Sequence, residues 1–347
     1  INVNVNDTSC LNVHKSCNYW ALNNECLLNP NWMEINCAKA CNTCNKQSIS
    51  FRNKYCNNAY KNETECYYWA NNDQCIKNFV WMSQNCAKAC KFCTYDQRCE
   101  PTKYYNSALN LADKPNGDLY KNVFDKVLGN QFLVDKYDIK LIHLSPPILM
   151  FNNFLPNIIV DEFLNQTFMF KRSTSSGDMH ENGSYSRNVA LERTSFNTWC
   201  DYGTTCIDNY GTQQIYHNLE EILGISRDHY EQLQVLNYTK DQFYSYHHDF
   251  LDVQRDLIPG PRILTFFIYL SNVDGGGSTS FPLLNLDVKP KKGMAILWPN
   301  ILTNDPYTRD ILTSHTAKNV TKGTKYAVNA WIHLSNYNNA YIKSCAG

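Results

Sequence analysis

The chain lacks net charge and lacks any long apolar run, and each absence excludes a class of protein. Lys plus Arg and Asp plus Glu both number 32 among 347 residues, so the formal charge is +0. This balance argues against a binder of duplex nucleic acid, which needs a basic face, and against a polybasic protein of membrane surfaces. No apolar stretch approaches the roughly 20 residues of a membrane-spanning helix. Hydrophobic residues still make up 43% of the chain, which excludes a disordered protein.

Several catalytic motifs are missing as well. The chain contains no HExxH zinc-binding motif, no Gly-rich phosphate loop and no GxSxG nucleophile motif. We recognise no signal peptide in it, and its start at Ile1 suggests that such a leader has been removed or that the numbering begins at the mature terminus.

Cysteine is scarce in most of the chain, because only three of the 16 cysteines follow residue 99. Cytosolic reductants would keep the thirteen early cysteines reduced, so they indicate a disulfide or metal framework in an oxidising compartment. We therefore expect the lumen of the endoplasmic reticulum or the extracellular space. Six Asn-x-Ser/Thr sequons fit this expectation as candidate glycosylation sites: Asn6, Asn62, Asn165, Asn182, Asn237 and Asn319.

The first hundred residues are a tandem repeat. The segment Asn36–Cys41 recurs as Asn85–Cys90, and Trp20 and Trp69 are both followed by alanine. We interpret the repeat as two copies of a small module, at 1–47 and 48–95. Two sets of six cysteines share their last four spacings of 8, 10, 3 and 2 residues: Cys10, Cys17, Cys26, Cys37, Cys41 and Cys44, then Cys56, Cys66, Cys75, Cys86, Cys90 and Cys93.

Modules this short cannot bury enough surface to fold alone, so covalent staples must replace the core. Zinc is the alternative, through Cys37, Cys41 and Cys44, but six cysteines in a module exceed the four ligands that zinc takes. We therefore expect disulfides. Six cysteines allow 15 connectivities, and the spacing alone does not choose among them.

The cysteine spacing resembles the ShK-toxin-like (ShKT) domain, a secreted module of two short helices. In the toxins of that family, an adjacent Lys-Tyr pair blocks potassium channels. The matching positions here are Asn31-Trp32 and Val80-Trp81, so the resemblance implies an accessory or adhesion module instead. The family's pairing implies these disulfides: Cys10–Cys44, Cys17–Cys37, Cys26–Cys41, Cys56–Cys93, Cys66–Cys86 and Cys75–Cys90.

The composition changes near residue 100. Residues 96–139 are expected to be a linker and a helical entry to a larger domain at 140–347, with helices near 157–165 and 213–223. Many strands without regular helices between them favour an antiparallel sandwich or barrel with helices packed outside. The runs with strand character, rich in branched and aromatic residues, are 141–143, 233–238, 242–250, 263–270, 294–298 and 326–333.

Two histidines and one aspartate in this domain are candidate metal ligands. On the predicted strand at 242–250, His247 and Asp249 share parity and project to one side. His315 follows 66 residues after Asp249. Two histidines and one carboxylate are the facial triad of non-haem Fe(II) oxygenases. The His247–Asp249 pair alone, or His315 alone, would be weak evidence of a metal site. His248 has the opposite parity, and we interpret it as a supporting or surface residue.

A lysine is expected in the sheet interior. Lys325, Trp331 and His333 share parity, so all three should point inward. An inward lysine is costly unless it meets an anion, which indicates an acidic ligand.

From Leu144 to Ser335 the order of motifs resembles the 2-oxoglutarate- and Fe(II)-dependent prolyl 4-hydroxylases. The resemblance implies a double-stranded β-helix (jelly-roll) core with flanking helices, so that the chain would be two small disulfide-rich α modules plus an α+β domain. The motifs that carry it are Arg193-Thr-Ser195 with Trp199, Leu233–Tyr238, His247-x-Asp249, Arg262–Leu270, Gly276–Pro282, Lys292–Ala295, and His315 with Lys325 ten residues later.

The resemblance also implies roles for individual residues. The implied metal ligands are His247, Asp249 and His315, and Lys325 would pair with the distal carboxylate of 2-oxoglutarate, helped by Thr279 and Tyr238. The implied peptide-binding residues are Tyr244, Arg262, Trp331 and His333, with Arg193 and Ser195 in a mobile loop that closes over the peptide.

Three positions depart from the family pattern. Ser278 replaces a glutamate, which would loosen its turn, and Asn319 stands near the place of a proline. Tyr238 and Tyr244 have opposite parity to His247, so a bulge or twist must re-aim them if they line the site.

The remaining cysteines predict a local Cys200–Cys206 bridge, which leaves Cys99–Cys345 as the last pair.

The implied activity is hydroxylation of proline in secreted proline-rich or collagen-like polypeptides, with Fe(II), 2-oxoglutarate, O₂ and ascorbate, giving succinate and CO₂. Such a partner suits a neutral chain and a groove lined by Tyr244, Trp331 and Trp199, because polyproline II segments dock on aromatic side chains. Two alternatives stay open: a structural or binding protein on a catalytically retired oxygenase fold, and a hydroxylase of lysine or another side chain. Neither nucleic acid nor a membrane span is expected, and the sequence does not indicate an oligomeric state.

Overall fold

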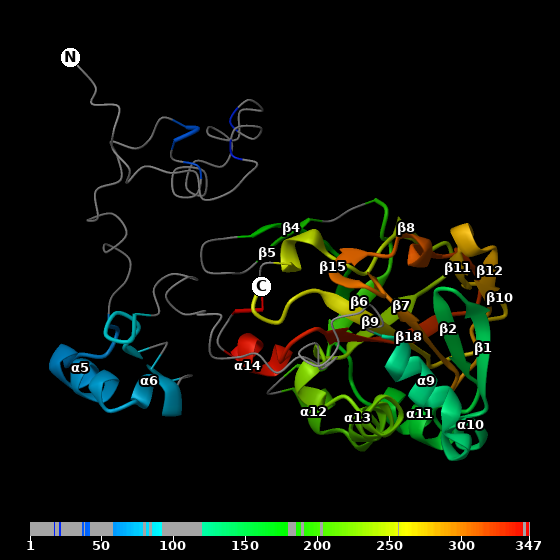
Figure 1. Ribbon diagram of the computed structural model, residues 1–347, viewed down its shortest axis with the longest axis horizontal. Coiled ribbons are helices and arrows are strands. Elements are labelled where there is room, and N and C mark those ends of the chain that lie inside the picture. Colours follow the sequence, from blue (N-terminus) through cyan, green and yellow to red (C-terminus); the bar gives the residue numbers. More distant parts are fainter. Residues whose placement is uncertain are drawn as a thin grey trace. The chain divides into compact units, whose positions relative to one another are not determined.

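The computed structural model consists of two compact units, bounded by Ile1–Arg98 with Met179–Ser184 and by Cys99–Asp178 with Tyr185–Gly347 (Figure 1). Each unit is described by itself. The structure describes residues 17, 21, 37, 39–41, 58–78, 81–82, 85–91, 120–179, 185–188, 191–201, 204–255, 257–342 and 345–346.

The first unit is held together by cystines and aromatic rings. Its second module contains helices α5 (Glu63–Asn71) and α6 (Gln74–Lys77). The side chain of Asn62 begins α5 by accepting the N–H of Glu65 at 3.4 Å. The rings of Tyr60, Trp69 and Trp81 pack against one another with centroids 5.1–5.6 Å apart. These rings and the half-cystines are the core that so short a segment can build.

Three of the disulfides that the family resemblance implied are confirmed: Cys17–Cys37, Cys66–Cys86 and Cys75–Cys90. Cys41 is also disulfide-bonded, and its expected partner Cys26 lies outside the described residues. The remaining two expected pairs, Cys10–Cys44 and Cys56–Cys93, fall on residues that the structure does not describe.

The second unit is built on two antiparallel sheets, as the jelly-roll expectation requires. The larger sheet has the order β1 (Ile139–Leu144), β2 (Pro147–Phe151), β13 (Ala295–Pro299), β9 (Arg262–Tyr269), β18 (Lys325–His333), β7 (Gln234–Tyr238), β6 (Phe196–Trp199) and β3 (Lys171–Arg172). The smaller sheet has the order β12 (Leu286–Val288), β11 (Thr279–Phe281), β16 (His315–Ala317) and β8 (Tyr244–His247).

Strand β18 shows why the larger sheet has two different faces. Its even-numbered residues from Val328 to Ile332 join the core beneath the helices. Its odd-numbered side chains face the smaller sheet, and Ala327 belongs to the core cluster between the sheets. Both faces are buried, so most residues of the strand are apolar, and the buried polar exceptions are Lys325, Asn329 and His333.

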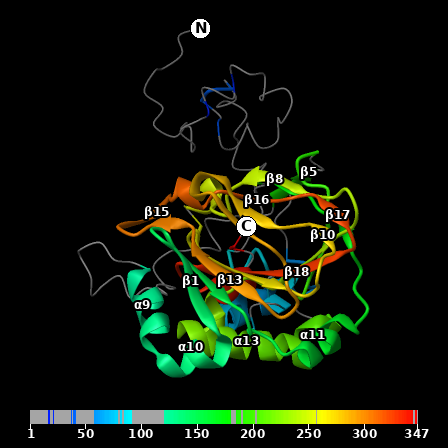
Figure 2. The same ribbon diagram turned by 90° about the vertical axis from the view of Figure 1, so that its right-hand side faces the viewer.

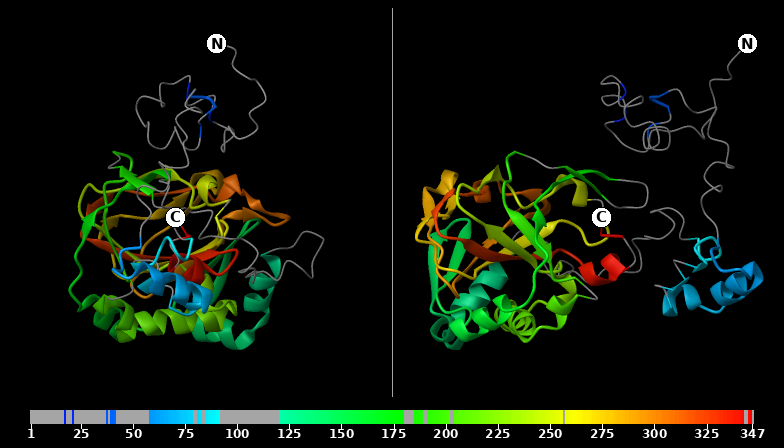
Figure 3. Two further views of the ribbon diagram at one scale, coloured as in Figure 1. Left: turned by 90° about the vertical axis from the view of Figure 1, so that its left-hand side faces the viewer. Right: turned by 180° about the vertical axis from the view of Figure 1, so that it is seen from behind.

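Helices cover the outer face of the larger sheet. In Figure 2, α10 (Gln131–Tyr137), α13 (Tyr210–Leu223) and α11 (Asn157–Leu164) lie along one side of the unit, and β8 and β16 lie at the opposite side. Figure 3 shows the same arrangement from two further directions. Helix α9 (Lys121–Gly129) precedes α10, so the expected helical entry is confirmed.

Helix α13 has clear sequence signals at both ends. Asn209 accepts the N–H of Gly211 at 2.8 Å and begins the helix. Gly224 ends it with φ of +64°, a conformation that favours glycine. The buried stripe between them includes Ile215, Leu219 and Ile222, which pack under the sheet.

The remaining elements are short. Among the described residues, no helix is long and apolar enough to cross a membrane. The elements are α12 (Thr205–Asp208), α14 (Tyr337–Ile342), the 3-10 helices η4 (Arg227–His229), η5 (Asp252–Gln254), η6 (Pro282–Leu284) and η7 (Ile311–Thr313), and the strand pairs β4 (Ser175–Met179) with β5 (Tyr185–Asn188), β10 (Gly275–Gly276) with β17 (Val320–Lys322), and β14 (Ile301–Leu302) with β15 (Asp305–Arg309).

Candidate metal centre and co-substrate site

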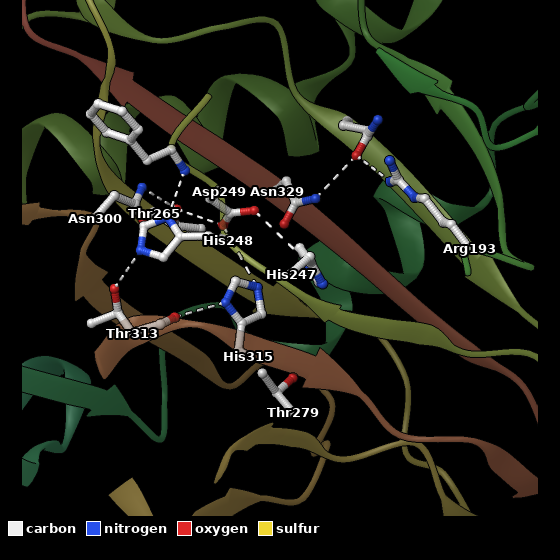
Figure 4. Close-up of polar contacts among 12 residues, drawn as sticks. Arg193, His247, His248, Asp249, Thr265, Thr279, Asn300, Thr313, His315 and Asn329 are labelled. Carbon is white, nitrogen blue, oxygen red and sulfur yellow. Dashed lines mark hydrogen bonds and ion pairs between the residues drawn. The ribbon is translucent and has the colours of Figure 1, made fainter. Parts of the chain in front are cut away.

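The three expected metal ligands meet at the end of the smaller sheet (Figure 4). His247 is the last residue of β8 and His315 the first of β16, and the two are direct partners across the strands. The Nε2 atoms of His247 and His315 lie 3.9 Å and 3.8 Å from the two carboxylate oxygens of Asp249. Within the described part of the chain, this is the one cluster of three such donors, with ligand atoms within 4.8 Å of one another.

The predicted strand at 242–250 is shorter than expected. β8 ends at His247, so Asp249 lies in the turn that follows it. Strand parity is therefore not the reason why His247 and Asp249 meet; the turn after β8 brings the carboxylate back to the imidazole.

Hydrogen bonds orient both imidazoles toward the same point. His247 Nδ1 lies 2.7 Å from Ser245 O, and His315 Nδ1 lies 3.0 Å from Thr313 O. A carbonyl can only accept, so each Nδ1 carries the proton and each Nε2 presents a lone pair. This tautomer is the one that a metal ligand needs.

A chain of hydrogen bonds from Asn300 through Thr265 holds the carboxylate of Asp249 in place. Its Oδ2 accepts the hydroxyl of Thr265 at 2.8 Å, and that hydroxyl accepts the amide of Asn300 at 2.8 Å. Burial alone would raise the pKa of Asp249, but attraction to His315 and His247 outweighs it and lowers the pKa to about 2. The carboxylate is therefore ionised at neutral pH.

His247 is neutral under the same conditions. Burial, reinforced by repulsion from His315, holds the pKa of His247 well below 6.5. Two imidazoles and one carboxylate are the donor set of a non-haem Fe(II) centre, so the residues present fit that metal.

A bulge in β8 turns Tyr244 toward the site. Between the pairs His315↔His247 and Ala317↔Tyr244 the register shifts, so three steps on β8 face two on β16. As a result, the ring of Tyr244 stacks on the ring of His247 with centroids 3.5 Å apart. The bulge that the parity of Tyr244 required is confirmed.

Lys325 is fully buried between the sheets. Its Nζ lies 5.3–5.5 Å from the ring centroids of Tyr238, Phe267 and Tyr269. Among the described residues it has no hydrogen-bond partner. Burial lowers the pKa of Lys325 to about 7, although Asp287 acts in the opposite direction. A buried ammonium without a partner is suited to the carboxylate of a ligand, and the inward direction predicted for Lys325 is correct.

The two residues expected beside Lys325 come from different sheets. Tyr238 is the direct partner of Lys325 across β7 and β18. Thr279 is buried on β11 and accepts the hydroxyl of Tyr269 at 2.8 Å. Tyr269 was missed from the sequence, although its parity on the strand at 263–270 already placed it on the side facing the site.

Arg262 and His333 meet at a carboxylate that the sequence reading missed. Glu231 accepts Arg262 Nε at 2.5 Å and Arg262 Nη2 at 2.9 Å, and lies 2.7 Å from His333 Nε2. The guanidinium of Arg262 also lies 3.6 Å from the ring of Trp331. Burial raises the pKa of Glu231, but attraction to Arg262 is stronger, and the pKa is lowered to about 2.

His333 does not present a free edge to a peptide. Its side chain is fully buried, and Nδ1 lies 2.7 Å from Gly260 O while Nε2 meets Glu231. Both ring nitrogens of His333 are thus used inside the protein, where the side chain supports Glu231.

Arg193 and Ser195 are packed into the fold. Ser195 is fully buried and donates to Ser173 Oγ at 2.9 Å. Arg193 donates to Gln234 Oε1 at 3.0 Å, and its guanidinium lies 4.6 Å from the ring of Tyr244. Arg193 thus reaches the site, whereas Ser195 lies beneath it.

Ser278, one of the departures from the family pattern, is hydrogen-bonded in the structure. The Ser278 hydroxyl donates to Asp287 Oδ1 at 3.0 Å, and the same carboxylate oxygen lies 2.9 Å from Lys318 Nζ. Ser278 thus has a hydrogen-bond partner across the turn, and the loosening relative to the family's glutamate stays a prediction.

The local disulfide Cys200–Cys206 is confirmed. It directly follows Trp199, whose ring lies 6.0 Å from that of Trp331. Cys345 is also disulfide-bonded, and its predicted partner Cys99 lies outside the described residues.

The sequons differ in their surroundings. Asn62, Asn165 and Asn319 are exposed, whereas Asn237 lies inside β7 with a buried Oδ1 atom. Asn237 is therefore less accessible than the exposed sequons. Asn6 and Asn182 lie outside the described residues.

Comparison with known families agrees with this geometry. Residues 233–333 match the 2OG-Fe(II) oxygenase superfamily, and residues 9–44 and 55–93 match the ShK domain-like family. The chain thus carries a 2OG-Fe(II) oxygenase domain preceded by two ShK-like domains. The superfamily's cofactors, Fe(II) and 2-oxoglutarate, fit the triad and the buried lysine.

Curated relatives match part of the chain. The prolyl 4-hydroxylase subunit alpha-1 of Rattus norvegicus is 36% identical over 125 residues, covering 35% of this chain and 23% of that subunit. The Gallus gallus subunit is 30% identical over 186 residues, covering 52% and 35%. Probable prolyl 4-hydroxylase 7 of Arabidopsis thaliana is 35% identical over 132 residues, covering 33% and 41%. The chain spans 23% to 41% of the length of such relatives.

Solved structures with a similar arrangement include a viral collagen prolyl hydroxylase from Paramecium Bursaria Chlorella virus-1. It is 24% identical, with a TM-score of 0.40, covering 54% of this chain and 95% of that one. A prolyl hydroxylase from Trichoplax adhaerens is 17% identical, with a TM-score of 0.38, covering 62% and 92%.

Proposed function

We propose that this protein is a prolyl 4-hydroxylase of the secretory pathway that acts on proline in extended, proline-rich or collagen-like polypeptides. The observation that carries the proposal is the pairing of the triad with the unpartnered Lys325 ammonium in one sheet interior. Prolyl 4-hydroxylases recur among the relatives of the oxygenase domain, which supports proline as the target.

In this proposal His247, Asp249 and His315 hold Fe(II), and Lys325 holds the distal carboxylate of 2-oxoglutarate. When bound, iron and 2-oxoglutarate supply the oxidative decarboxylation that consumes O₂, releases succinate and CO₂, and oxidises a C–H bond. The aromatic rings around Lys325 would keep water from the salt bridge that the lysine would make. Thr279 and Tyr238 would assist it with their hydroxyls. Ascorbate would keep the iron ferrous between turnovers.

The peptide would lie beside Tyr244, Trp331, Trp199 and Arg262. Aromatic rings suit polyproline II segments, and Arg262 would donate to peptide carbonyls while Glu231 holds it in place. Arg193, held by Gln234 and lying over Tyr244, would contact the peptide from the β6 side.

The two ShK-like domains, at 1–47 and 48–95 in our division of the chain, would be accessory modules. Their disulfides favour an oxidising compartment, either the lumen of the endoplasmic reticulum or the extracellular space. Residues 96–139 would link them to the catalytic domain at 140–347.

The test is mass spectrometry of a proline-rich peptide incubated with the full chain, Fe(II), 2-oxoglutarate and ascorbate. We expect one added oxygen on proline, at C4 by fragment and NMR analysis, together with release of succinate. H315A serves as the inactive control. If the chain binds iron but oxidises no proline-rich peptide, the proposal fails. Failure to bind iron at all would favour a structural protein, and oxygen found on lysine would indicate a different hydroxylase.

A further inference from the structure

His248, which stands between two of the proposed metal ligands, contacts the segment before the third (Figure 4). Its Nε2 lies 2.9 Å from Asp310 O and 3.2 Å from Thr313 Oγ1. Its Nδ1 lies 2.9 Å from the backbone nitrogen of Phe250. Both ring nitrogens are therefore engaged by groups of the protein.

The partners of His248 fix its tautomer. The N–H of Phe250 can only donate, so Nδ1 must offer a lone pair, and Asp310 O can only accept, so Nε2 must carry the proton. Thr313 Oγ1 donates its own hydrogen to Asp310 O at 2.9 Å and turns a lone pair toward His248. The ring is thus a neutral cross-link with a defined direction.

Strand pairing does not set the position of Asp249, so the hydrogen bonds of His248 are needed to hold it. His247 and His315 are partners across β8 and β16, so strand pairing sets their separation. Asp249 lies in the turn after β8. The His248 ring holds this turn, because Nδ1 accepts the N–H of Phe250 and Nε2 donates to the carbonyl of Asp310.

Asp310, which accepts from His248, is also connected to the proposed third ligand, His315. Thr313 donates to the same Asp310 carbonyl that His248 contacts, and the carbonyl of Thr313 orients the ring of His315. His248 thereby links the turn that carries Asp249 to the segment that aims His315.

A second branch returns to the Asp249 carboxylate. The N–H of Asp310 donates to Asn300 O at 3.0 Å, and the Asn300 side chain supports Thr265, which donates to Asp249. Asn300 and Thr265 are fully buried. The backbone and the carboxylate of Asp249 are therefore held by one connected network that meets at Asp310.

We propose that His248 is a positioning residue of the metal centre, which sets the place of Asp249 relative to His315 through Asp310. The inference rests on the metal site of the proposed function. It predicts that loss of the donation from Nε2 to Asp310 changes metal affinity and coordination geometry before it changes the fold.

The test uses Co(II) titration of the full chain, followed by its ligand-field absorption, together with thermal unfolding of the metal-free protein. H248Q can keep an N–H near the position of Nε2, and H248N can keep an acceptor near the position of Nδ1. H248F fills the volume and removes both. H143F is the matched control, because His143 Nδ1 also meets a backbone carbonyl, Pro146 O, at 2.7 Å, on β1.

We expect H248F and H248N to weaken Co(II) binding about 10–100-fold, with an altered spectrum, because outer partners of metal ligands have effects of that size. H248Q should stay within about threefold of the unchanged chain. Unfolding temperatures of H248F and H143F should fall by similar amounts, while H143F leaves Co(II) affinity and spectrum unchanged.

Two results would overturn the inference alone: Co(II) bound by H248F as tightly and with the same spectrum as by the unchanged chain, or equal losses in H248Q and H248N. If H248F does not fold, the comparison of H248Q with H248N still decides. If the unchanged chain binds no Co(II), the proposed metal centre fails and the inference fails with it.

Discussion

The ring of Tyr244 lies flat on the ring of His247, with centroids 3.5 Å apart and planes 13° from parallel. This stack exists because the bulge in β8 turns Tyr244 to the same side as His247. The Tyr244 ring therefore restricts the orientation of a proposed metal ligand and also lies under the guanidinium of Arg193, 4.6 Å from its centroid.

Substitutions of Tyr244 should separate these effects. Y244F keeps the stacked ring, so we expect Co(II) affinity within about twofold of the unchanged chain, whereas Y244A frees the imidazole and should weaken binding about tenfold. Both affinities come from Co(II) titration of the full chain. Y246A is the control on the same strand, because Tyr246 is 53% exposed and should leave Co(II) binding unchanged. Equal Co(II) affinity in Y244A and Y246A would contradict a role for the stack.

The strands and the three candidate metal ligands could be predicted because their signals are local or follow a strong order of motifs. Lys325 is an example: parity along an apolar run placed its side chain between the sheets, and the structure buries it completely. Asp249 is the opposite case. It was expected on a strand, but the strand ends two residues earlier, and the turn depends on His248 and Asp310, 62 residues apart.

Glu231 could not be found from its own neighbourhood in the sequence. Its partners Arg262 and His333 lie 31 and 102 residues away, and only the fold brings the three together. The family resemblance indicated Arg262 and His333 as peptide-binding residues and gave no signal for the carboxylate between them.

Glycosylation should distinguish two sequons that look alike in the sequence. Asn319 is exposed before β17, whereas the Oδ1 atom of Asn237 is buried within β7. We expect a glycan on Asn319 and none on Asn237 when the folded chain is secreted by a eukaryotic host. T321A should remove one glycan, and T239A, which changes an equally exposed threonine, should remove none. Mass spectrometry after enzymatic release of glycans checks both, and a glycan on Asn237 in folded protein would contradict the expectation that partial burial protects this side chain.

Glu231 should be a strong determinant of stability. E231Q leaves Arg262 buried without a charged partner, and breaking such a pair costs about 3–5 kcal/mol of unfolding free energy. Urea unfolding measures the loss, with E162Q as the control because Glu162 is exposed on α11. The folded-state pKa of Glu231, about 2, lies below the ordinary value of 4.5, so its contribution is present above pH 4.5 and is lost as the pH falls toward 2. E231Q should therefore flatten the acid limb of the stability curve, and an unchanged limb would show that other groups control it.

Binding of 2-oxoglutarate should weaken as the pH rises above 7. Burial lowers the pKa of Lys325 to about 7, and the dianionic ligand needs the ammonium form. Each pH unit above that value should then lower the affinity by up to about tenfold, because binding takes up one proton. Calorimetric titration of the Co(II)-loaded chain at several pH values measures this slope. K325R, which stays protonated, should bind with little pH dependence, and an equal slope in K325R would place the titrating group elsewhere.

Replacement of Lys325 should stabilise the protein that it inactivates. The folded-state pKa of about 7 lies below the ordinary value of 10.5, so between these values the folded chain binds fewer protons than the unfolded chain and stability rises with pH. K325M removes this penalty, and we expect the unfolding free energy of the metal-free protein to rise by about 1–4 kcal/mol at pH 7 or below, with a smaller gain toward pH 10. Urea unfolding followed by circular dichroism measures both, with K322M as the control because Lys322 is exposed on β17. A K325M variant that gains stability and loses 2-oxoglutarate binding would show that the lysine is placed there for its ligand, since an uncompensated buried cation does not help the fold. A K325M variant less stable than the parent at every pH would mean instead that Lys325 has a structural partner in the folded protein.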